Sequence, residues 1–152
     1  MPLTFRRAHP DEAAALTALA LRSKRHWRYD EAFMGAALAA MEITPEAIAD
    51  SIAIVAERDA ARVGFYVLGV EPEGPTLRDL WLEPTTIGTG LGAMLWTHII
   101  GEARAAGFRT VRLVSDPHAA GFYARMGAQY VGDVESVAVK GRMLPAFEIE
   151  VG

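Results

Sequence analysis

Three glycines, Gly88, Gly90 and Gly92, stand close together near mid-chain, directly before a stretch with helical spacing. Glycine lacks a Cβ and tolerates positive φ, so the backbone here can come within hydrogen-bond distance of a ligand. The amides of Thr89 to Ala93 would lie at a helix N-terminus, where the helix dipole favours negative charge. The pattern predicts a phosphate or pyrophosphate site. A tight loop in which the glycines serve only the turn is the alternative.

Two nucleotide-binding motifs can be compared with this segment. A Walker loop needs Lys-Ser or Lys-Thr after its last glycine, whereas Ala93-Met94 follows here, which argues against a nucleoside triphosphate. Gly88-x-Gly90-x-x-Ala93 does fit the dinucleotide fingerprint, with Asp116 downstream to meet a ribose. Against an NAD-type site, the preceding strands look antiparallel, and the remaining sixty or so residues are too few for a second nucleotide-binding half.

Composition and charge exclude several classes of protein. The chain has 152 residues, 51% of them apolar, which predicts one domain over residues 1–152. Its 15 Lys and Arg residues against 19 Asp and Glu leave a formal charge of −4, which does not suit a nucleic-acid partner. No apolar run approaches the ~20 residues that cross a bilayer, and the first residues lack a signal-peptide core. We expect a cytoplasmic protein with no membrane partner.

Metal and thiol chemistry are also disfavoured. The chain has no cysteine, so it has no thiolate ligand and no thiol nucleophile. The four histidines show no i,i+4 pairing of the kind that binds zinc. We therefore expect no metal cofactor.

The elements that must position the glycine segment follow from hydrophobic spacing and turn residues. Strands are predicted over residues 3–6, 52–57, 62–70 and 76–82, and helices over 13–25, over 31–41 and from Thr44. The glycines then lead into a helix that ends near Gly107. A strand over 110–115, a helix over 117–126 with Asp116 as N-cap, and strands over 128–131 and 147–151 complete the chain. This order predicts a mixed α/β (α+β) domain.

Two segments carry a family resemblance. The strand ending at Leu82-Glu83-Pro84 is followed by Ile87-Gly88-Thr89-Gly90-Leu91-Gly92 and a helix, and about thirty residues later the chain reads Ala119-Ala120-Gly121-Phe122-Tyr123-Ala124-Arg125-Met126-Gly127. In this order they resemble the two signatures of the GCN5-related N-acetyltransferases (the GNAT family), and the element order fits that family along the whole chain. The departure is Ile87, where the family usually has Arg or Gln.

The resemblance implies a fold and a cofactor. It implies one GNAT-like domain with a twisted, mostly antiparallel sheet flanked by helices, in which parallel strands four (76–82) and five (110–115) splay apart. The pantetheine arm of acetyl-coenzyme A would pair with exposed strand groups at Leu80 and Leu82. The cofactor site would be completed by Ile87, Gly88, Thr89, Gly90, Leu91, Gly92, Ala93, Asp116 and Phe122. Without an Arg or Gln at Ile87, coenzyme A binding should be weakened rather than abolished.

Acetyl transfer to an amine needs a neutral nucleophile, a stabilised oxyanion and a proton for the departing thiolate. The resemblance assigns Tyr123 as the donor to the sulfur, with an ordinary helix-face role as the alternative. Asp79 is a candidate base, directly or through water, although a cross-strand ion pair is an equally ordinary use. An amide near Leu82 would stabilise the oxyanion. Without cysteine to carry the acetyl group, we expect direct transfer in a ternary complex.

The family builds its acceptor pocket from the first two helices, their loop and the last strands. Trp27, Tyr29 and Arg142 are therefore the candidate substrate-binding residues. Arg28 or Arg142 holding a carboxylate would favour an amine that bears one, whereas an aromatic wall with Asp30 would suit a polyamine. Packing between helices is the alternative for the aromatic residues.

The predicted function is an acetyl-CoA-dependent N-acetyltransferase for a small-molecule primary amine. A non-catalytic acyl-CoA sensor with the same fold and an NAD-type oxidoreductase are the competing hypotheses. Members of this family often pair through edge strands, so the resemblance also allows a homodimer.

Overall fold

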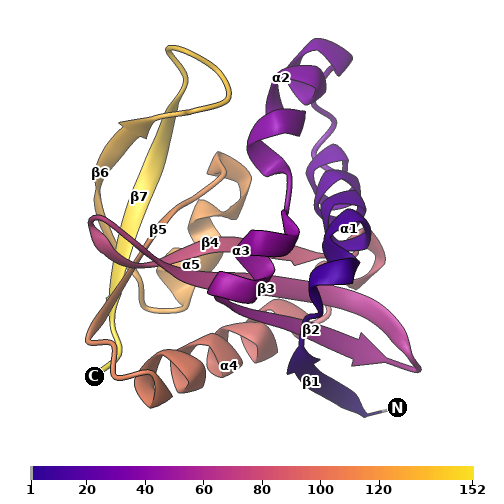
Figure 1. The fold of residues 1–152 in the computed structure, drawn as a ribbon. Helices are drawn as coiled ribbons and strands as arrows, with labels where there is room; N and C mark the ends of the chain where they lie inside the picture. The colour runs from indigo at the N-terminus through magenta and orange to yellow at the C-terminus, as the bar shows by residue number, and fades with distance from the viewer. Residues whose placement is uncertain (1) are drawn as a thin grey trace.

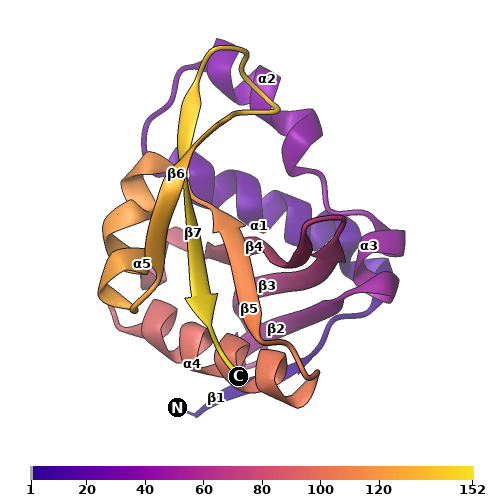
Figure 2. The same ribbon diagram turned by 90° about the vertical axis from the view of Figure 1, so that its left-hand side faces the viewer.

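The computed structural model describes residues 2–152, and Figures 1 and 2 show the path of the chain. Its elements run in the order β1 (Leu3–Arg7), η1 (Pro10–Glu12), α1 (Ala13–Arg25), α2 (Glu31–Met41), α3 (Pro45–Asp50), β2 (Ile52–Arg58), β3 (Ala61–Glu71), β4 (Gly74–Leu82), η2 (Pro84–Thr86), α4 (Leu91–Ala105), β5 (Thr110–Val114), η3 (Pro117–Ala119), α5 (Ala120–Arg125), β6 (Gln129–Glu135) and β7 (Met143–Glu150).

The strands form one sheet in the order β1-β2-β3-β4-β5-β7-β6. Every neighbouring pair is antiparallel except β4 and β5, which are parallel and have a single register pair, Thr76 with Arg112. The second half of β4 is therefore not paired with β5. This confirms the predicted fold class, and the antiparallel run from β2 to β4 rules out the doubly wound parallel sheet that a dinucleotide site requires.

Helices cover both faces of the sheet, with α1 and α3 on one side and α4 on the other (Figure 1). Alternation along the strands explains the two layers, because successive side chains point to opposite faces. On β3, Phe65 and Val67 pack with the residues of α1 and α2, whereas Tyr66 and Leu68 pack with those of α4. Each face thus has its own buried core.

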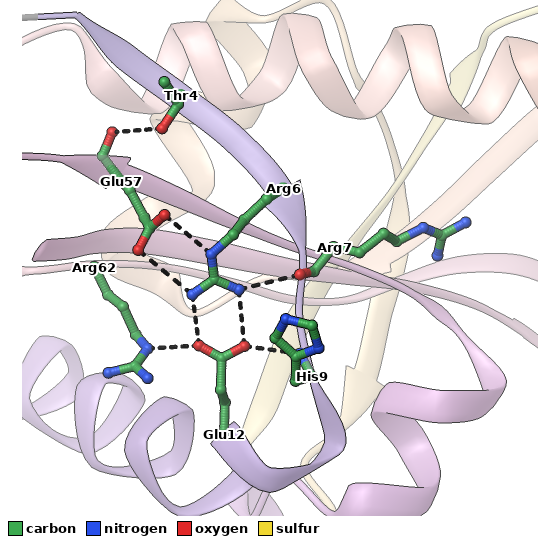
Figure 3. Close-up of polar contacts among 7 residues, drawn as sticks. All are labelled: Thr4, Arg6, Arg7, His9, Glu12, Glu57 and Arg62. Atoms are coloured by element: carbon green, nitrogen blue, oxygen red, sulfur yellow. Dashed lines mark hydrogen bonds and ion pairs between the residues drawn. The ribbon is translucent and has the colours of Figure 1, made fainter. Parts of the chain in front are cut away.

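An ion cluster fixes the start of α1 against the sheet (Figure 3). The guanidinium of Arg6 donates to both carboxylate oxygens of buried Glu12, at 2.9 and 2.7 Å, and to Glu57 at 3.0 Å. Arg62 Nε donates to Glu12 at 2.8 Å, and the backbone N–H of His9 donates at 2.7 Å. The hydrogen bonds from Arg6 hold the pKa of Glu12 well below its usual range.

The last two strands are longer than predicted. β6 continues to Glu135, and β7 already begins at Met143, whereas the sequence pattern indicates strands only over 128–131 and 147–151. Nearly all residues of β6 are exposed, so the strand shows no apolar alternation, and Gly132 and Pro145 weaken the strand signal further. None of the helices described in residues 2–152 has the length and apolar character needed to span a membrane.

Candidate active site

A cavity of about 510 Å³ lies where β4 separates from β5. It is bounded by the second half of β4, the glycine loop, the start of α4, the end of α1 and the η3–α5 segment. Its walls are mainly apolar, with a few polar groups among them. The lining residues are Ser23, Trp27, Leu80, Trp81, Leu82, Ile87, Gly88, Gly90, Gly92, Ala93, Asp116, His118, Ala119, Gly121, Phe122, Tyr123, Arg125 and Met126.

The glycine loop meets the requirements of an anion site. Gly88 and Gly90 have φ of +83° and +90°, which a residue with a side chain rarely adopts, and a Cβ at either position would meet no atom within 4 Å. Gly90 is the N-cap of α4, and Met94 is the first residue whose N–H returns to it, at 3.3 Å. The N–H groups of residues 91–93 therefore have no partner within the helix and face outward with its dipole behind them.

Three of the residues predicted to bind the cofactor in this loop contribute differently from the others. The N–H and hydroxyl of Thr89 both donate to the Thr86 carbonyl, at 3.2 and 2.5 Å, so its donors are occupied within the loop and it does not line the cavity. The side chain of Leu91 is buried in the core, which leaves only its N–H. A Cβ at Gly92 would lie 3.0 Å from Phe122, so this glycine allows α4 to pack closely on α5.

Tyr123 lies on α5 with its side chain buried against the cavity. Its ring packs edge-on against Trp96 and Phe122, at centroid distances of 5.7 and 5.2 Å. Within residues 2–152 its hydroxyl makes no hydrogen bond. Burial, and then the charge of Asp79, raise the pKa of Tyr123 well above its ordinary value, which keeps the phenol protonated and able to donate.

Asp79 lies on β4 just behind the cavity wall. Its carboxylate accepts a hydrogen bond from Trp81 Nε1 at 3.1 Å, and Trp81 itself lines the cavity. Burial raises the pKa of Asp79, and the Trp81 bond opposes this only in part. Among residues 2–152 no ion pair to Asp79 is formed, so the predicted alternative of a cross-strand ion pair is wrong. A half-buried carboxylate with a raised pKa is suited to proton transfer.

Asp116, the N-cap of η3 and a residue of the cavity wall, is the centre of a polar network. It accepts hydrogen bonds from Lys24 Nζ, from the hydroxyl of Tyr29 at 2.9 Å and from the backbone N–H of His118 at 2.9 Å, and Arg142 lies 3.8 Å away. Burial alone would raise the pKa of Asp116, but the hydrogen bond from Lys24 and its companions lower it below the ordinary value. Burial and the bond to Asp116 raise the pKa of Tyr29 to about 12.

Aromatic rings surround this network. Trp27 stacks on His118 at 4.8 Å with the two rings nearly parallel, and Tyr29 stacks on Phe33 at 4.1 Å. The ammonium of Lys24 lies 4.9 Å from the centre of the Tyr29 ring. Trp27 and His118 line the cavity, whereas Lys24, Tyr29 and Phe33 lie outside its lining and pack around Asp116.

The structure brings most of the predicted site residues together, with two differences. Asp116 lines the same cavity as the glycine loop, but its carboxylate already accepts from Lys24, Tyr29 and the His118 N–H. Tyr29 and Arg142 do not line the cavity but lie behind Asp116, joined by a 2.9 Å hydrogen bond from the guanidinium to the hydroxyl.

Sequence reasoning missed several other residues of the site. They include Ser23, Lys24, Phe33, Trp81, His118 as a stacking partner, and Arg125, a cation on the cavity wall. For one of these residues, Lys24 near the end of α1, helical spacing could have indicated a buried position. In residues 2–152 no three His, Asp or Glu side chains gather as metal ligands do.

Comparisons with known proteins identify the family. Residues 16–128 match the model of the Acetyltransferase (GNAT) family. A search of curated proteins found no match. Among solved structures, PaiA N-acetyltransferase from Thermoplasma acidophilum, in complex with coenzyme A, is similar with a TM-score of 0.78 over 99% of each chain, at 16% identity.

Two further structures have the same fold. A GCN5-related N-acetyltransferase from Rhodopseudomonas palustris has a TM-score of 0.80 at 19% identity, covering 99% of this chain and 96% of that one. The structure of yncA from Salmonella typhimurium, with its cofactor acetyl-CoA, has a TM-score of 0.71 at 20% identity, covering 100% of this chain and 95% of that one. Because the family model spans more than half of the sequence and the fold agrees along its length, this chain belongs to the GNAT family of acetyltransferases.

Proposed function

We propose that the protein is an acetyl-CoA-dependent N-acetyltransferase that acts on a small primary amine by direct transfer in a ternary complex. One observation carries the proposal: a single cavity joins an anion-binding glycine loop to the buried, protonated phenol of Tyr123. The loop would bind a diphosphate, and the phenol would donate a proton to a leaving thiolate. A binding module alone would need only the first of these.

The residues present fit coenzyme A. Gly88, Gly90 and the free amides of residues 91–93 would hold its diphosphate. Arg125, on the wall of the same cavity, would supply the cation that Ile87 does not. The part of β4 beyond Thr76, which has no partner on the β5 side, would pair with the pantetheine arm at Leu80 and Leu82.

The residues around the cavity also fit the chemistry. Asp79 would take a proton from the ammonium form of the acceptor, through water or directly, which frees the amine lone pair. A new N–C bond then forms at the acetyl carbonyl as the C–S bond breaks. Tyr123 would donate its proton to the sulfur and recover one from the nitrogen through solvent. The products are an N-acetylated amine and free coenzyme A, so atoms and protons balance.

Tyr123→Phe tests the proposal, because it removes the donor and keeps the ring. We expect the variant to bind coenzyme A as the wild type does, measured by calorimetry, while kcat for acetylation falls about 10²- to 10⁴-fold. Equal, slow thioester hydrolysis by both proteins, with no amine acetylated from a broad panel, would instead indicate an acyl-CoA sensor.

A further inference from the structure

Asp116 joins segments that are far apart in the sequence. Its carboxylate accepts hydrogen bonds from Lys24 Nζ near the end of α1 and, at 2.9 Å, from the hydroxyl of Tyr29 in the next loop. Arg142, in the loop between β6 and β7, lies 3.8 Å from the carboxylate and donates to the Tyr29 hydroxyl at 2.9 Å. Asp116 also caps η3 by accepting from the His118 N–H. One carboxylate thus fixes the start of η3 to α1 and to two loops.

Further contacts hold the same segments together. Lys24 Nζ and Arg142 Cζ lie 4.9 and 5.3 Å from the centre of the Tyr29 ring, so this ring contacts both cations. Beside them, the ring of Trp27 stacks on that of His118, which belongs to η3, at 4.8 Å. The start of η3 is therefore joined to the end of α1 and the loop after it by an ion pair, hydrogen bonds and a ring stack.

The segment that begins at η3 carries the candidate proton donor. η3 runs directly into α5, the six-residue helix that contains Tyr123. A helix of this length is too short to be stable by itself, so its position depends on tertiary contacts. Toward its C-terminal end these contacts are apolar, because the Tyr123 ring packs against Trp96 and Phe147 at 5.7 and 6.0 Å. At the other end they are those of Asp116 and its partners.

Stability alone does not explain the ion pair of Lys24 and Asp116. Their side chains are 10% and 11% exposed, so both charges have lost most of their hydration. The cost of removing two charges from water can exceed their attraction, and well-packed apolar residues of similar volume are often as stable. A charge-assisted hydrogen bond differs from apolar contact in having a defined direction. The pair is therefore suited to fixing the position at which η3 begins.

We propose that Lys24 and Arg142 are positioning residues, which act through Asp116 to hold η3 and α5 where the phenol of Tyr123 reaches the sulfur of the thioester. Neither Lys24 nor Arg142 lines the cavity, so their effect on the reaction passes through Asp116, which does. This inference rests on the proposed acetyltransferase function and extends its machinery beyond the cavity wall. A change outside the cavity should then lower kcat through Tyr123.

The double variant Lys24→Met/Asp116→Asn removes the ion pair with little other change. Methionine is as long and unbranched as the carbon chain of lysine, asparagine still caps η3, and no buried carboxylate is left unpaired. The variant should fold with a Tm within about 5 °C of the wild type. We expect kcat for acetylation to fall about 10- to 100-fold, because a small displacement of a reacting group has an effect of this size. An unchanged kcat would overturn the proposal.

A double-mutant cycle with Tyr123→Phe separates positioning from a general structural role. If the ion pair acts through the phenol, its removal from the Tyr123→Phe variant should lower kcat no further, since the donor is already missing. Losses that multiply would show that the pair does not act through Tyr123, and would overturn the proposal. Arg142→Gln, which changes the more distant cation, should lower kcat about 3- to 10-fold and follow the same cycle.

Hydrogen exchange tests the positioning without any reaction. In Lys24→Met/Asp116→Asn the backbone N–H groups of residues 117–126 should exchange about tenfold faster than in the wild type, while those of α4 keep their rate. Arg112→Gln/Glu148→Gln is the matched control, because it removes an ion pair of 3.3 Å between β5 and β7 outside the cavity lining. It should leave both exchange and kcat unchanged.

The exchange measurement also separates this inference from the proposed function. Faster exchange confined to residues 117–126 would support the anchoring of η3 and α5 even if no amine were acetylated, an outcome that would overturn the enzymatic proposal. Unchanged exchange in this segment, or a uniform rise along the whole chain, would overturn the positioning role whatever the activity.

Discussion

The indole N–H of Trp81 donates a hydrogen bond to the carboxylate of Asp79 at 3.1 Å, two residues earlier on the same strand. The two side chains share a face of β4 because alternate residues of a strand do. Among residues 2–152, Trp81 is the one side chain that donates a hydrogen bond to Asp79. This bond opposes the rise in the pKa of Asp79 that burial causes. Trp81 therefore connects the cavity wall to the acidity of the candidate base.

Trp81→Phe should move the pH dependence of the enzyme. Losing the donor removes an interaction with the charged form of Asp79, so its pKa rises further. A base works only when deprotonated, so the acidic limb of the kcat/KM profile should shift to higher pH. The limb is measured with one acceptor and saturating acetyl-CoA. An unchanged midpoint, whatever the change in rate, would show that Asp79 is not the base.

Gly90→Ala tests the backbone requirement of the loop. A methyl group there meets no atom within 4 Å, so the cost comes from φ of +90° alone and should be about 1–2 kcal/mol in the free energy of unfolding. If the residue relaxes to negative φ instead, the amides of residues 91–93 turn away and KM for acetyl-CoA rises. Gly101→Ala, within α4 and equally uncrowded, is the control and should stabilise the protein by about 1 kcal/mol.

The parts of the site that could be predicted depend on local signals. Gly88 and Gly90 are needed for their own φ, and Asp116 caps the residues that follow it, so a short window of sequence indicates each. The predicted positions of helices and strands rest on the same kind of signal. The same signals do not show that the donors of Thr89 close the loop on the Thr86 carbonyl.

The parts that could not be predicted depend on distant pairs. Lys24 and Asp116 are 92 positions apart, and neither has a neighbour in sequence that indicates the other. The same holds for Tyr29 and Arg142, which meet only because the long β6–β7 pair brings the loop before Met143 over the first two helices. Charge type along one segment cannot show which cation pairs with which distant carboxylate.

Ile87→Arg should improve cofactor binding. Ile87 lines the cavity beside Gly88 with an apolar side chain, where a guanidinium could reach the diphosphate. We expect Kd for coenzyme A to fall about 3- to 30-fold and to become more dependent on salt, while Ile87→Met leaves it nearly unchanged. Calorimetry at two salt concentrations measures both effects. A fall in affinity would mean that Arg125 already occupies that role and repels the new cation.

Arg125→Ala should have the opposite effect. Its guanidinium lies on the cavity wall one turn from Gly121, where a Cβ would be only 3.2 Å from Nη1. Removing it should raise Kd for coenzyme A about tenfold, with kcat at saturating acetyl-CoA unchanged, because its proposed role is to bind the diphosphate and not the reacting thioester. In the Arg125→Ala background, Ile87→Arg should lower Kd by a larger factor than it does in the wild type. Independent, additive effects would show that the two positions do not share a phosphate.

Glu12→Gln should make stability less dependent on pH. The pKa of Glu12 is depressed in the folded state, so its ion pairs stabilise the fold above the unfolded value near 4.5 and that contribution is lost as the pH falls below it. At pH 7 the variant leaves Arg6 and Arg62 facing a neutral amide and should lose about 3 kcal/mol of unfolding free energy. Urea denaturation of both proteins between pH 7 and pH 2 measures the difference, which should shrink steadily toward acid. A constant difference would mean that Glu12 acts through its shape and its hydrogen bond to the His9 N–H rather than through its charge.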